Sequence, residues 1–209
     1  MTGKRRVAIL ISGRGSNMSA LIDASRDPTY PAEIVAVISN RPDAKGLERA
    51  REAKIAAEAI DHKAFSSRED FEAALEARLE AHVVDLVALA GFMRLMTPSF
   101  VERWRGAMIN IHPALLPAFK GLATHERALE AGVRIHGCTV HYVTPGMDEG
   151  PIIAQAAVPV LPGDTAERLA ARVLEAEHRL YPAALARVAR GEAPIISGRV
   201  EIAGGDLIR

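Results

Sequence analysis

The sequence predicts a three-layer α/β fold of the Rossmann-like type, with a mostly parallel central sheet and an antiparallel portion near the C-terminal half. Up to residue 130, short apolar runs rich in Val and Ile alternate with amphipathic helical patterns, which is typical of parallel strands covered on both faces. Two extended segments then follow one another with no helical pattern between them, which indicates a hairpin. We expect a single domain over residues 1–209.

Composition and charge narrow the class of protein. Of the 209 residues, 49% are hydrophobic, and Lys plus Arg equals Asp plus Glu at 26 each, so no net charge favours nucleic acid or an anionic membrane. Cys138 is the only cysteine, which excludes an intrachain disulfide. The apolar run Val7 to Ile11 is too short for a signal peptide, and no stretch is long enough to span a bilayer. We therefore expect a cytoplasmic protein without nucleic-acid or membrane partners.

The first part of the chain should supply parallel strands and the helices between them. Apolar runs predict strands at 6–11, 33–38, 56–60 and 83–90. Helical patterns fall at 44–53 and 67–81, and another begins after the first strand with Ser16 or Asn17 as its candidate N-cap. Thr97 as N-cap and Pro98 at the first position begin a further helix, which Gly106 ends.

The second part should complete the sheet. We expect a buried strand at 107–111, a helix at 124–130 and extended segments at 133–143 and 151–160. The longest helix begins at 163–165, and Pro182 should kink or break it near Tyr181 because proline lacks a backbone N–H. A small terminal hairpin should pair 195–196 with 200–202.

Two polar side chains at the end of the 107–111 strand are the main candidates for chemistry. Alternation along a strand points Asn110 and His112 to the same side. In open α/β sheets, ligands bind at the carboxyl ends of the strands. An amide and an imidazolium can both donate to an oxyanion, which suits acyl or formyl transfer. The alternative is that Asn110 forms a turn and His112 is a hydrogen-bonded core residue.

The loop from Ser12 to Asn17 is a candidate phosphate site. Its two glycines allow a sharp turn into a helix N-terminus, whose free N–H groups attract anions. The third glycine of a dinucleotide fingerprint is absent, because Met18 stands there, and the Gly-Lys-Ser/Thr ending of a P-loop is absent too. A monophosphate is therefore favoured over NAD or ATP. The alternative is a plain tight turn without a ligand.

Three further features have both a functional and an ordinary reading. The apolar loop from Gly91 to Met96 either walls a pocket for a flat organic molecule or caps the core. Asp148 lies in a Gly- and Pro-rich turn, and it matters only if the hairpin folds back beside His112, where a carboxylate would raise the His112 pKa. On the helical pattern alone, Glu177 and His178 belong to a solvated face.

A metal site and a serine nucleophile are both disfavoured. His136, Cys138 and His141 could be imagined as ligands, but in a strand the first two share a face and His141 points away, with no fourth ligand near. Around Ser16 the Gly-x-Ser-x-Gly pattern of a nucleophile elbow is absent.

From Ile9 to about Pro182, the chain is similar to the phosphoribosylglycinamide formyltransferases, a folate-dependent formyltransferase family. The motifs that carry the resemblance, in order, are Ser12-Gly-x-Gly-Ser-Asn17, Gly46-Leu-x-Arg-Ala50, Leu89-Ala-Gly-Phe-Met-Arg94, Asn110-Ile-His-Pro-x-Leu-Leu-Pro117, His136-Gly-x-Thr-Val-His141 and Asp148-x-Gly-Pro151. The resemblance implies the formyltransferase variant of the fold, with nucleotide phosphate bound by the N-terminal half, folate by the C-terminal half and catalytic residues at the junction.

The resemblance also implies a reaction and its site residues. The formyl group of 10-formyltetrahydrofolate, a co-substrate, would pass to the amine of 5-phosphoribosylglycinamide in de novo purine synthesis, without a metal. Asn110 would contact the formyl group, His112 would be the catalytic acid, and Asp148 would raise the His112 pKa. The residues implied to bind glycinamide ribonucleotide are Gly15, Ser16, Asn17, Leu174, Glu175, Ala176 and Glu177. Those implied to bind folate are Arg68, Met93, Arg94, Leu95, Met96, Asn110, Thr144, Pro145, Gly146, Met147 and Asp148.

Other functions remain as rivals. A methionyl-tRNA formyltransferase shares the Asn-x-His-Pro core but needs a basic RNA-binding domain, which a neutral chain of this length lacks. A formyltetrahydrofolate hydrolase shares the three catalytic residues but has no use for the phosphate loop. A plain nucleotide-binding module would need only the loop. Ala123 stands where relatives often carry a polar side chain, and the sequence leaves open monomer or homodimer and the isomer of Leu116-Pro117.

Overall fold

The computed structural model describes residues 3–201, whose centre is a seven-stranded sheet with strand order β3-β2-β1-β4-β5-β6-β7. Its strands are β1 (Arg5–Ile11), β2 (Ala32–Ser39), β3 (Ala56–Ala59), β4 (Leu86–Leu89), β5 (Met108–His112), β6 (Ile135–Tyr142) and β7 (Ile152–Pro159). The first five strands pair in parallel, whereas β6 is antiparallel to both β5 and β7. The predicted mostly parallel sheet with an antiparallel portion is confirmed.

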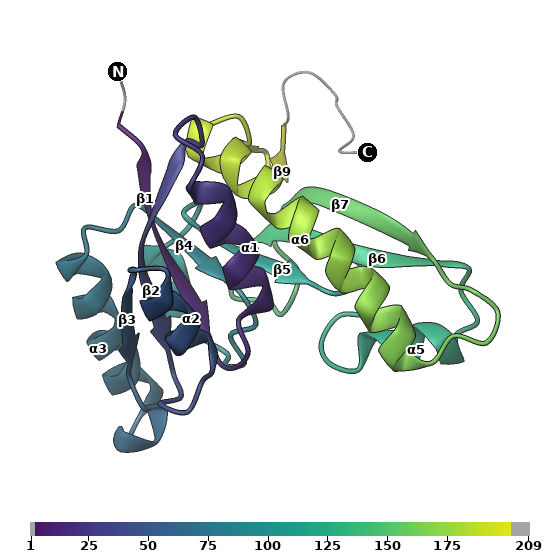
Figure 1. The fold of residues 1–209 in the computed structure, drawn as a ribbon, viewed down its shortest axis with the longest axis horizontal. Helices are drawn as coiled ribbons and strands as arrows, with labels where there is room; N and C mark the ends of the chain where they lie inside the picture. The colour runs from purple at the N-terminus through teal and green to yellow at the C-terminus, as the bar shows by residue number, and fades with distance from the viewer. Residues whose placement is uncertain (1–2, 202–209) are drawn as a thin grey trace.

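Helices cover both faces of this sheet (Figure 1). They are α1 (Ser16–Ser25), α2 (Gly46–Glu52), α3 (Arg68–Ala81), α4 (Pro98–Arg103), α5 (Thr124–Glu130) and α6 (Ala166–Arg190), with a short 3₁₀ helix at His62–Ala64. One core packs α1, α2, α5 and α6 against the sheet, and a second core packs α3 and α4 against the other face.

The alternation of β1 shows why an apolar run becomes a central strand. Val7, Ile9 and Ile11 point into the core under α1 and α6, whereas Ala8 and Leu10 point into the core under α3, and all five are fully buried. A strand buried on both faces needs apolar residues at every position. Because β4 pairs in parallel with both β1 and β5, the carboxyl ends of these three strands lie side by side at one edge of the sheet. Asn110 and His112 stand at this edge.

The start of α1 differs from the prediction. Gly15, with φ of 70°, precedes the helix in the left-handed conformation, and no side chain caps the first turn. Ser16 and Asn17 are therefore helical residues, and their expected role as N-cap is wrong. Close packing explains the glycine, because a Cβ there would lie 3.1 Å from the Met18 methyl carbon and 3.2 Å from Gly46 Cα.

The expected break in the longest helix is also wrong. α6 is continuous from Ala166 to Arg190 with Pro182 inside it. Tyr181, Ala184 and Leu185 are fully buried on either side of the proline, and the Tyr30 hydroxyl donates to the Pro182 carbonyl at 2.7 Å. Burial along the helix therefore outweighs the lost backbone hydrogen bond.

The ends of the chain add little to the site. Two short strands, β8 (Ile195–Ile196) and β9 (Arg199–Val200), form the predicted antiparallel hairpin. Its second strand is shifted from the expected 200–202: it includes Arg199 and not Glu201, and Ile202 lies outside the described residues. None of the helices within residues 3–201 has the length and apolar character that crossing a bilayer requires.

Candidate active site

The structure brings Asn110 and His112 together at the carboxyl end of β5. They lie on the same side of the strand, and His112 is 5% exposed. Asn110 sits directly opposite His141 of β6, and its amide Nδ2 is 3.2 Å from His141 Nε2. The loop after β5 includes a cis peptide bond between Leu116 and Pro117.

Asp148 reaches this pair from the turn between β6 and β7. Its Oδ2 is 3.4 Å from His112 Nδ1 and accepts the backbone N–H of Gly121 at 2.8 Å, while its Oδ1 is 3.8 Å from His141 Nε2. The residue has a positive φ of 53°, a conformation that aspartate tolerates better than most residues. The hairpin therefore folds back and places Asp148 beside the His112 imidazole, as a functional role for Asp148 requires.

Both ring nitrogens of His112 face oxygen acceptors. Its Nε2 lies 3.0 Å from the Phe119 carbonyl oxygen, and its Nδ1 faces the Asp148 carboxylate. A carbonyl oxygen can only accept, so Nε2 carries a hydrogen in this arrangement. An acceptor on each side suits an imidazolium, because both of its nitrogens donate. For His112 to donate to a developing oxyanion, its Nε2–H has to leave the Phe119 carbonyl, while Nδ1 stays beside Asp148.

His141 and the Phe119 carbonyl are parts of this cluster that sequence reasoning missed. The sequence presents His141 as a disfavoured metal ligand and as the end of one motif, with no role assigned to it, and no signal in the sequence marks a backbone carbonyl. The His136 ring packs beside Phe119, with 5.8 Å between the ring centres, and its centre is 5.3 Å from that of the His125 ring. Within residues 3–201, no three His, Cys, Asp or Glu side chains are grouped as a metal ion requires.

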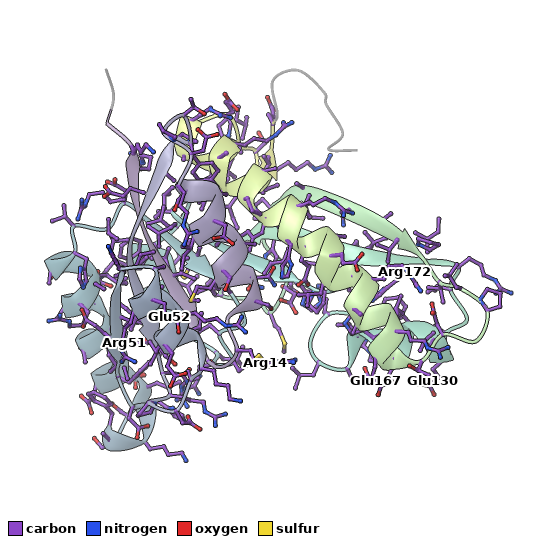
Figure 2. All side chains as sticks on the ribbon, viewed as in Figure 1. Arg14, Arg51, Glu52, Glu130, Glu167 and Arg172 are labelled. Carbon is purple, nitrogen blue, oxygen red and sulfur yellow. The ribbon has the colours of Figure 1, made fainter. Side chains whose placement is uncertain are left out.

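At the same edge of the sheet, the loop before α1 holds the candidate phosphate site. Figure 2 labels Arg14 of this loop, near the middle of the view and below α1. The Asn17 amide Nδ2 donates to Glu177 Oε2 at 2.7 Å, and Glu177 is 6% exposed. Burial raises the pKa of Glu177, and the bond from Asn17 partly opposes this. The solvated-face reading of Glu177 is therefore wrong, because α6 packs against α1.

The other positions implied on α6 differ from Glu177. Ala176 belongs to the core, Glu175 is exposed, and Leu174 is half-buried. Among these four residues, Glu177 is the one that accepts a hydrogen bond from Asn17, in the first turn of α1.

The apolar loop after β4 partly caps the core, as one reading predicted, and it also exposes apolar side chains. Met93 and Leu95 are exposed by 66% and 63%, whereas Phe92 and Met96 pack against the core under α3. The Arg94 guanidinium lies 5.7 Å from the centre of the Phe71 ring. The loop thus presents alternate side chains to solvent, where a flat ligand would meet Met93 and Leu95. Nearby positions implied for folate, Arg68 at the start of α3 and Met147 in the β6–β7 turn, are exposed as well.

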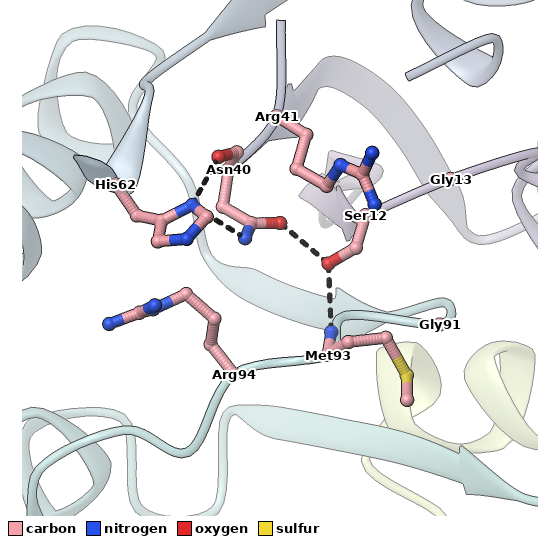
Figure 3. A pocket seen from close by; sticks show the side chains of 8 residues that line it. All are labelled: Ser12, Gly13, Asn40, Arg41, His62, Gly91, Met93 and Arg94. Atoms are coloured by element: carbon pink, nitrogen blue, oxygen red, sulfur yellow. Dashed lines mark hydrogen bonds between the residues drawn. The ribbon is translucent and has the colours of Figure 1, made fainter. Parts of the chain in front are cut away.

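A cleft of about 320 Å³ lies beside this loop (Figure 3). Its lining residues are Ser12, Gly13, Asn40, Arg41, His62, Gly91, Met93 and Arg94. The Ser12 hydroxyl donates to Asn40 Oδ1 at 2.5 Å and accepts the Met93 N–H at 2.8 Å, so it ties the loop to β1 and β2. Asn110, His112 and Asp148 are not among its lining residues, whereas Met93 and Arg94, two positions implied for folate, are.

Sequence and structure comparisons agree on what the chain is similar to. The family model described as formyl transferase matches residues 5–185. The chain is 46% identical over 185 residues to phosphoribosylglycinamide formyltransferase of Escherichia coli K12, a match that covers 88% of this chain and 87% of that protein. The solved structure of glycinamide ribonucleotide transformylase 1 from Symbiobacterium toebii matches with a TM-score of 0.94 and 50% identity, over 97% of this chain and 95% of that chain.

Larger relatives contain a matching segment. The chain is 53% identical over 190 residues to the trifunctional purine biosynthetic protein adenosine-3 of Gallus gallus, which covers 91% of this chain and 19% of that protein. The chain therefore spans about a fifth of the length of these curated relatives.

Proposed function

Because the chain belongs to the formyl transferase family, we propose that it transfers the formyl group of 10-formyltetrahydrofolate to the amine of 5-phosphoribosylglycinamide. The products are 5-phosphoribosyl-N-formylglycinamide and tetrahydrofolate, in de novo purine synthesis. The observation that carries the proposal is the convergence of Asn110, His112 and Asp148 at one end of β5. A helix N-terminus suited to a phosphate lies at the same edge of the sheet.

In the proposed reaction, the amine nitrogen of the glycinamide attacks the formyl carbon and forms the new C–N bond. The formyl oxygen then gains negative charge, which N–H groups of Asn110 and His112 stabilise by donating to it. The Asp148 carboxylate stabilises the positive charge on the His112 ring. The tetrahedral centre collapses, the bond to the folate nitrogen breaks, and the proton lost by the amine passes to that nitrogen.

We assign substrate binding to two parts of the edge. The phosphate would be held at Gly15, Ser16 and Asn17, where backbone N–H groups of the first turn of α1 have no side-chain cap to satisfy them. Glu177 would complete the nucleotide site through its bond to Asn17. The folate would lie against the β4 loop from Met93 to Met96 and the β6–β7 turn from Thr144 to Asp148, with Arg68 at one end. Met93, Leu95 and Met147 are the large apolar side chains exposed in these two segments.

The domain boundaries and the setting are part of the same proposal. We assign residues 1–209 to one formyltransferase domain, with nucleotide phosphate held by its N-terminal half and folate by its C-terminal half. A cytoplasmic location fits the substrates and the balanced charge of 26 basic and 26 acidic residues. The other activities of the trifunctional relatives belong to those proteins, of which this chain matches a fifth.

One assay tests the proposal against its rivals. Formyl folate is supplied with and without glycinamide ribonucleotide, and release of tetrahydrofolate is followed. We expect release only when the nucleotide is present, with one formylated nucleotide formed for each folate released. Release without the nucleotide would identify a hydrolase. No release under either condition would leave a nucleotide-binding module.

A further inference from the structure

The ring of His141 has its hydrogen position fixed by its neighbours. His141 is 3% exposed, and its Nδ1 lies 2.9 Å from the carbonyl oxygen of Tyr142. Because a carbonyl oxygen only accepts, Nδ1 must carry the hydrogen. Burial is the largest effect on the pKa of His141 and lowers it. The Tyr142 carbonyl and Asp148 raise this pKa by less, so the ring is neutral near pH 7. A neutral ring with a hydrogen on Nδ1 has a lone pair on Nε2.

That lone pair decides which way the amide of Asn110 faces. His141 Nε2 lies 3.2 Å from the Asn110 side chain, so the Asn110 atom beside it must be the NH₂ group and not the oxygen. The reversed amide would set two lone pairs against each other in a buried place. The Asp148 carboxylate oxygen nearest to Nε2 is 3.8 Å away, beyond hydrogen-bond distance, which agrees with the absence of a hydrogen on Nε2.

Two features of the backbone near His141 fit the contact between its Nδ1 and the Tyr142 carbonyl. A Cβ added to Gly150 would overlap the Tyr142 carbonyl oxygen and would lie 3.4 Å from His141 Nδ1. Glycine therefore allows the end of the β6–β7 turn to close directly over the Tyr142 carbonyl and the ring. The pairing of β6 with β7 is also irregular between Val140 and His141, as at many sites where a side chain is re-aimed.

We propose that His141 is a positioning residue that acts through Asn110. By accepting one N–H of the Asn110 amide, it holds the second N–H and Oδ1 in fixed directions, so that the second N–H donates to the formyl oxygen. This inference rests on the proposed function, since it deepens the role of the same site. His141 itself touches neither substrate, and its effect belongs to the chemical step and not to binding.

A matched pair of variants separates positioning from structural support. In His141→Gln, the side-chain oxygen can stand near the place of Nε2 and still accept from Asn110. In His141→Asn, the shorter amide can reach the Tyr142 carbonyl but leaves Asn110 without its acceptor. We expect kcat to fall about 30-fold in His141→Asn and by less than about fivefold in His141→Gln, with KM for both substrates within about twofold. Equal losses in the two variants would overturn the proposal.

A double-mutant cycle with Asn110→Ala tests the route of the effect. If His141 acts through Asn110, His141→Asn should lower kcat by less than about threefold when Asn110 is already alanine. A full 30-fold loss in that background would show that His141 acts independently, which overturns the inference. Unfolding midpoints measured for all variants confirm that each is folded under the assay conditions.

A spectroscopic measurement on the free protein does not depend on catalysis. Nitrogen-15 spectra of the imidazole rings, with His141 assigned by comparison with His141→Gln, should show hydrogen on Nδ1 and none on Nε2 at neutral pH. Hydrogen on Nε2, or a charged ring, would overturn the proposal even if the protein transfers formyl groups. If the protein transfers none, the proposed function fails while the Nδ1–H state of His141 can still be observed.

Discussion

Asp148 Oδ2 lies 3.4 Å from His112 Nδ1 and also accepts the backbone N–H of Gly121 at 2.8 Å. The Gly121 N–H thus orients the Asp148 carboxylate, which faces the imidazole of His112 at the end of β5. Its side chain is 12% exposed and that of His112 is 6% exposed, so water screens the attraction only weakly.

Asp148→Asn keeps the shape of the side chain and the acceptor for Gly121 but removes the charge that faces His112. We expect kcat to fall about 100-fold, because the imidazolium loses its stabilising partner. His112→Ala should lose most turnover as well. Nucleotide affinity, measured by titration calorimetry, should stay within about twofold in both variants. The control is Asp27→Asn, at an exposed turn, which should leave kcat unchanged. Lost nucleotide binding in either site variant would contradict these roles.

Glu177→Gln should make the protein more stable and bind the nucleotide more weakly. Burial raises the pKa of Glu177, so the folded state holds its proton to a higher pH than the unfolded state does. The contribution of this group to stability is therefore present below the unfolded pKa and is lost as pH rises through the folded pKa. Glutamine avoids that loss, and denaturant unfolding at pH 7 should show a higher free energy of unfolding for the variant than for the wild type.

The same Glu177→Gln preparations should show weaker nucleotide binding by calorimetry, because the charged partner of Asn17 is gone. Glu175→Gln, on an exposed position of the same helix, is the matched control and should change neither quantity. A loss of stability in Glu177→Gln would show that its charge supports the fold.

His136 should weaken the fold in mild acid. The ring is 1% exposed, neither nitrogen has a hydrogen-bond partner of normal geometry, and burial together with His125 lowers its pKa to about 4, against a smaller opposing effect of the Pro113 backbone. The unfolded chain takes up this proton near pH 6.5 and the folded chain only near pH 4. The free energy of unfolding should therefore fall as pH is lowered through this window, by up to about 3 kcal/mol from this residue.

His136→Leu keeps an apolar side chain of similar size and removes the titrating group. Urea unfolding of the variant should show a smaller decrease between pH 7 and pH 4.5 than that of the wild type. Equal decreases in the two proteins would rule His136 out as the source of acid sensitivity.

Tyr181→Phe should destabilise the protein more than Tyr30→Phe does. The Tyr181 hydroxyl is fully buried and lies 2.9 Å from the carbonyl of Leu89, the last residue of β4, and 3.3 Å from the carbonyl of Ile109 in β5. The Tyr30 hydroxyl serves one half-buried carbonyl, that of Pro182. We expect a cost of about 2 kcal/mol for Tyr181→Phe and about 1 kcal/mol or less for Tyr30→Phe, measured by urea unfolding.

Local rules of the backbone explain what the sequence could predict. The period of two in a strand put Asn110 and His112 on one side, and this holds because every strand alternates in the same way. Thr97 caps α4 and Pro98 begins it as predicted, since both act within one turn of the helix. The mixed sheet followed from the absence of a helix between β6 and β7.

Long-range packing decided what the sequence could not predict. Pro182 remains inside α6 because Tyr181 and Leu185 are buried beside it, and local preference carries no information about that burial. Gly15 replaces a capping side chain because Gly46, from another segment, packs against it. The position of His141 between Asn110 and Asp148 depends on the pairing of β5 with β6, and its hydrogen depends on a carbonyl that no motif records.

Glu177 and Tyr181 stand one helical turn apart on α6 and so project from the same face. The first accepts a hydrogen bond from Asn17 in the first turn of α1, and the second donates to the carbonyl of Ile109, the residue before Asn110. A ligand that displaced one of these side chains by tilting the helix would carry the other with it. If the proposed phosphate site at the start of α1 is occupied, α6 therefore offers a direct structural connection from it to β5, beside Asn110.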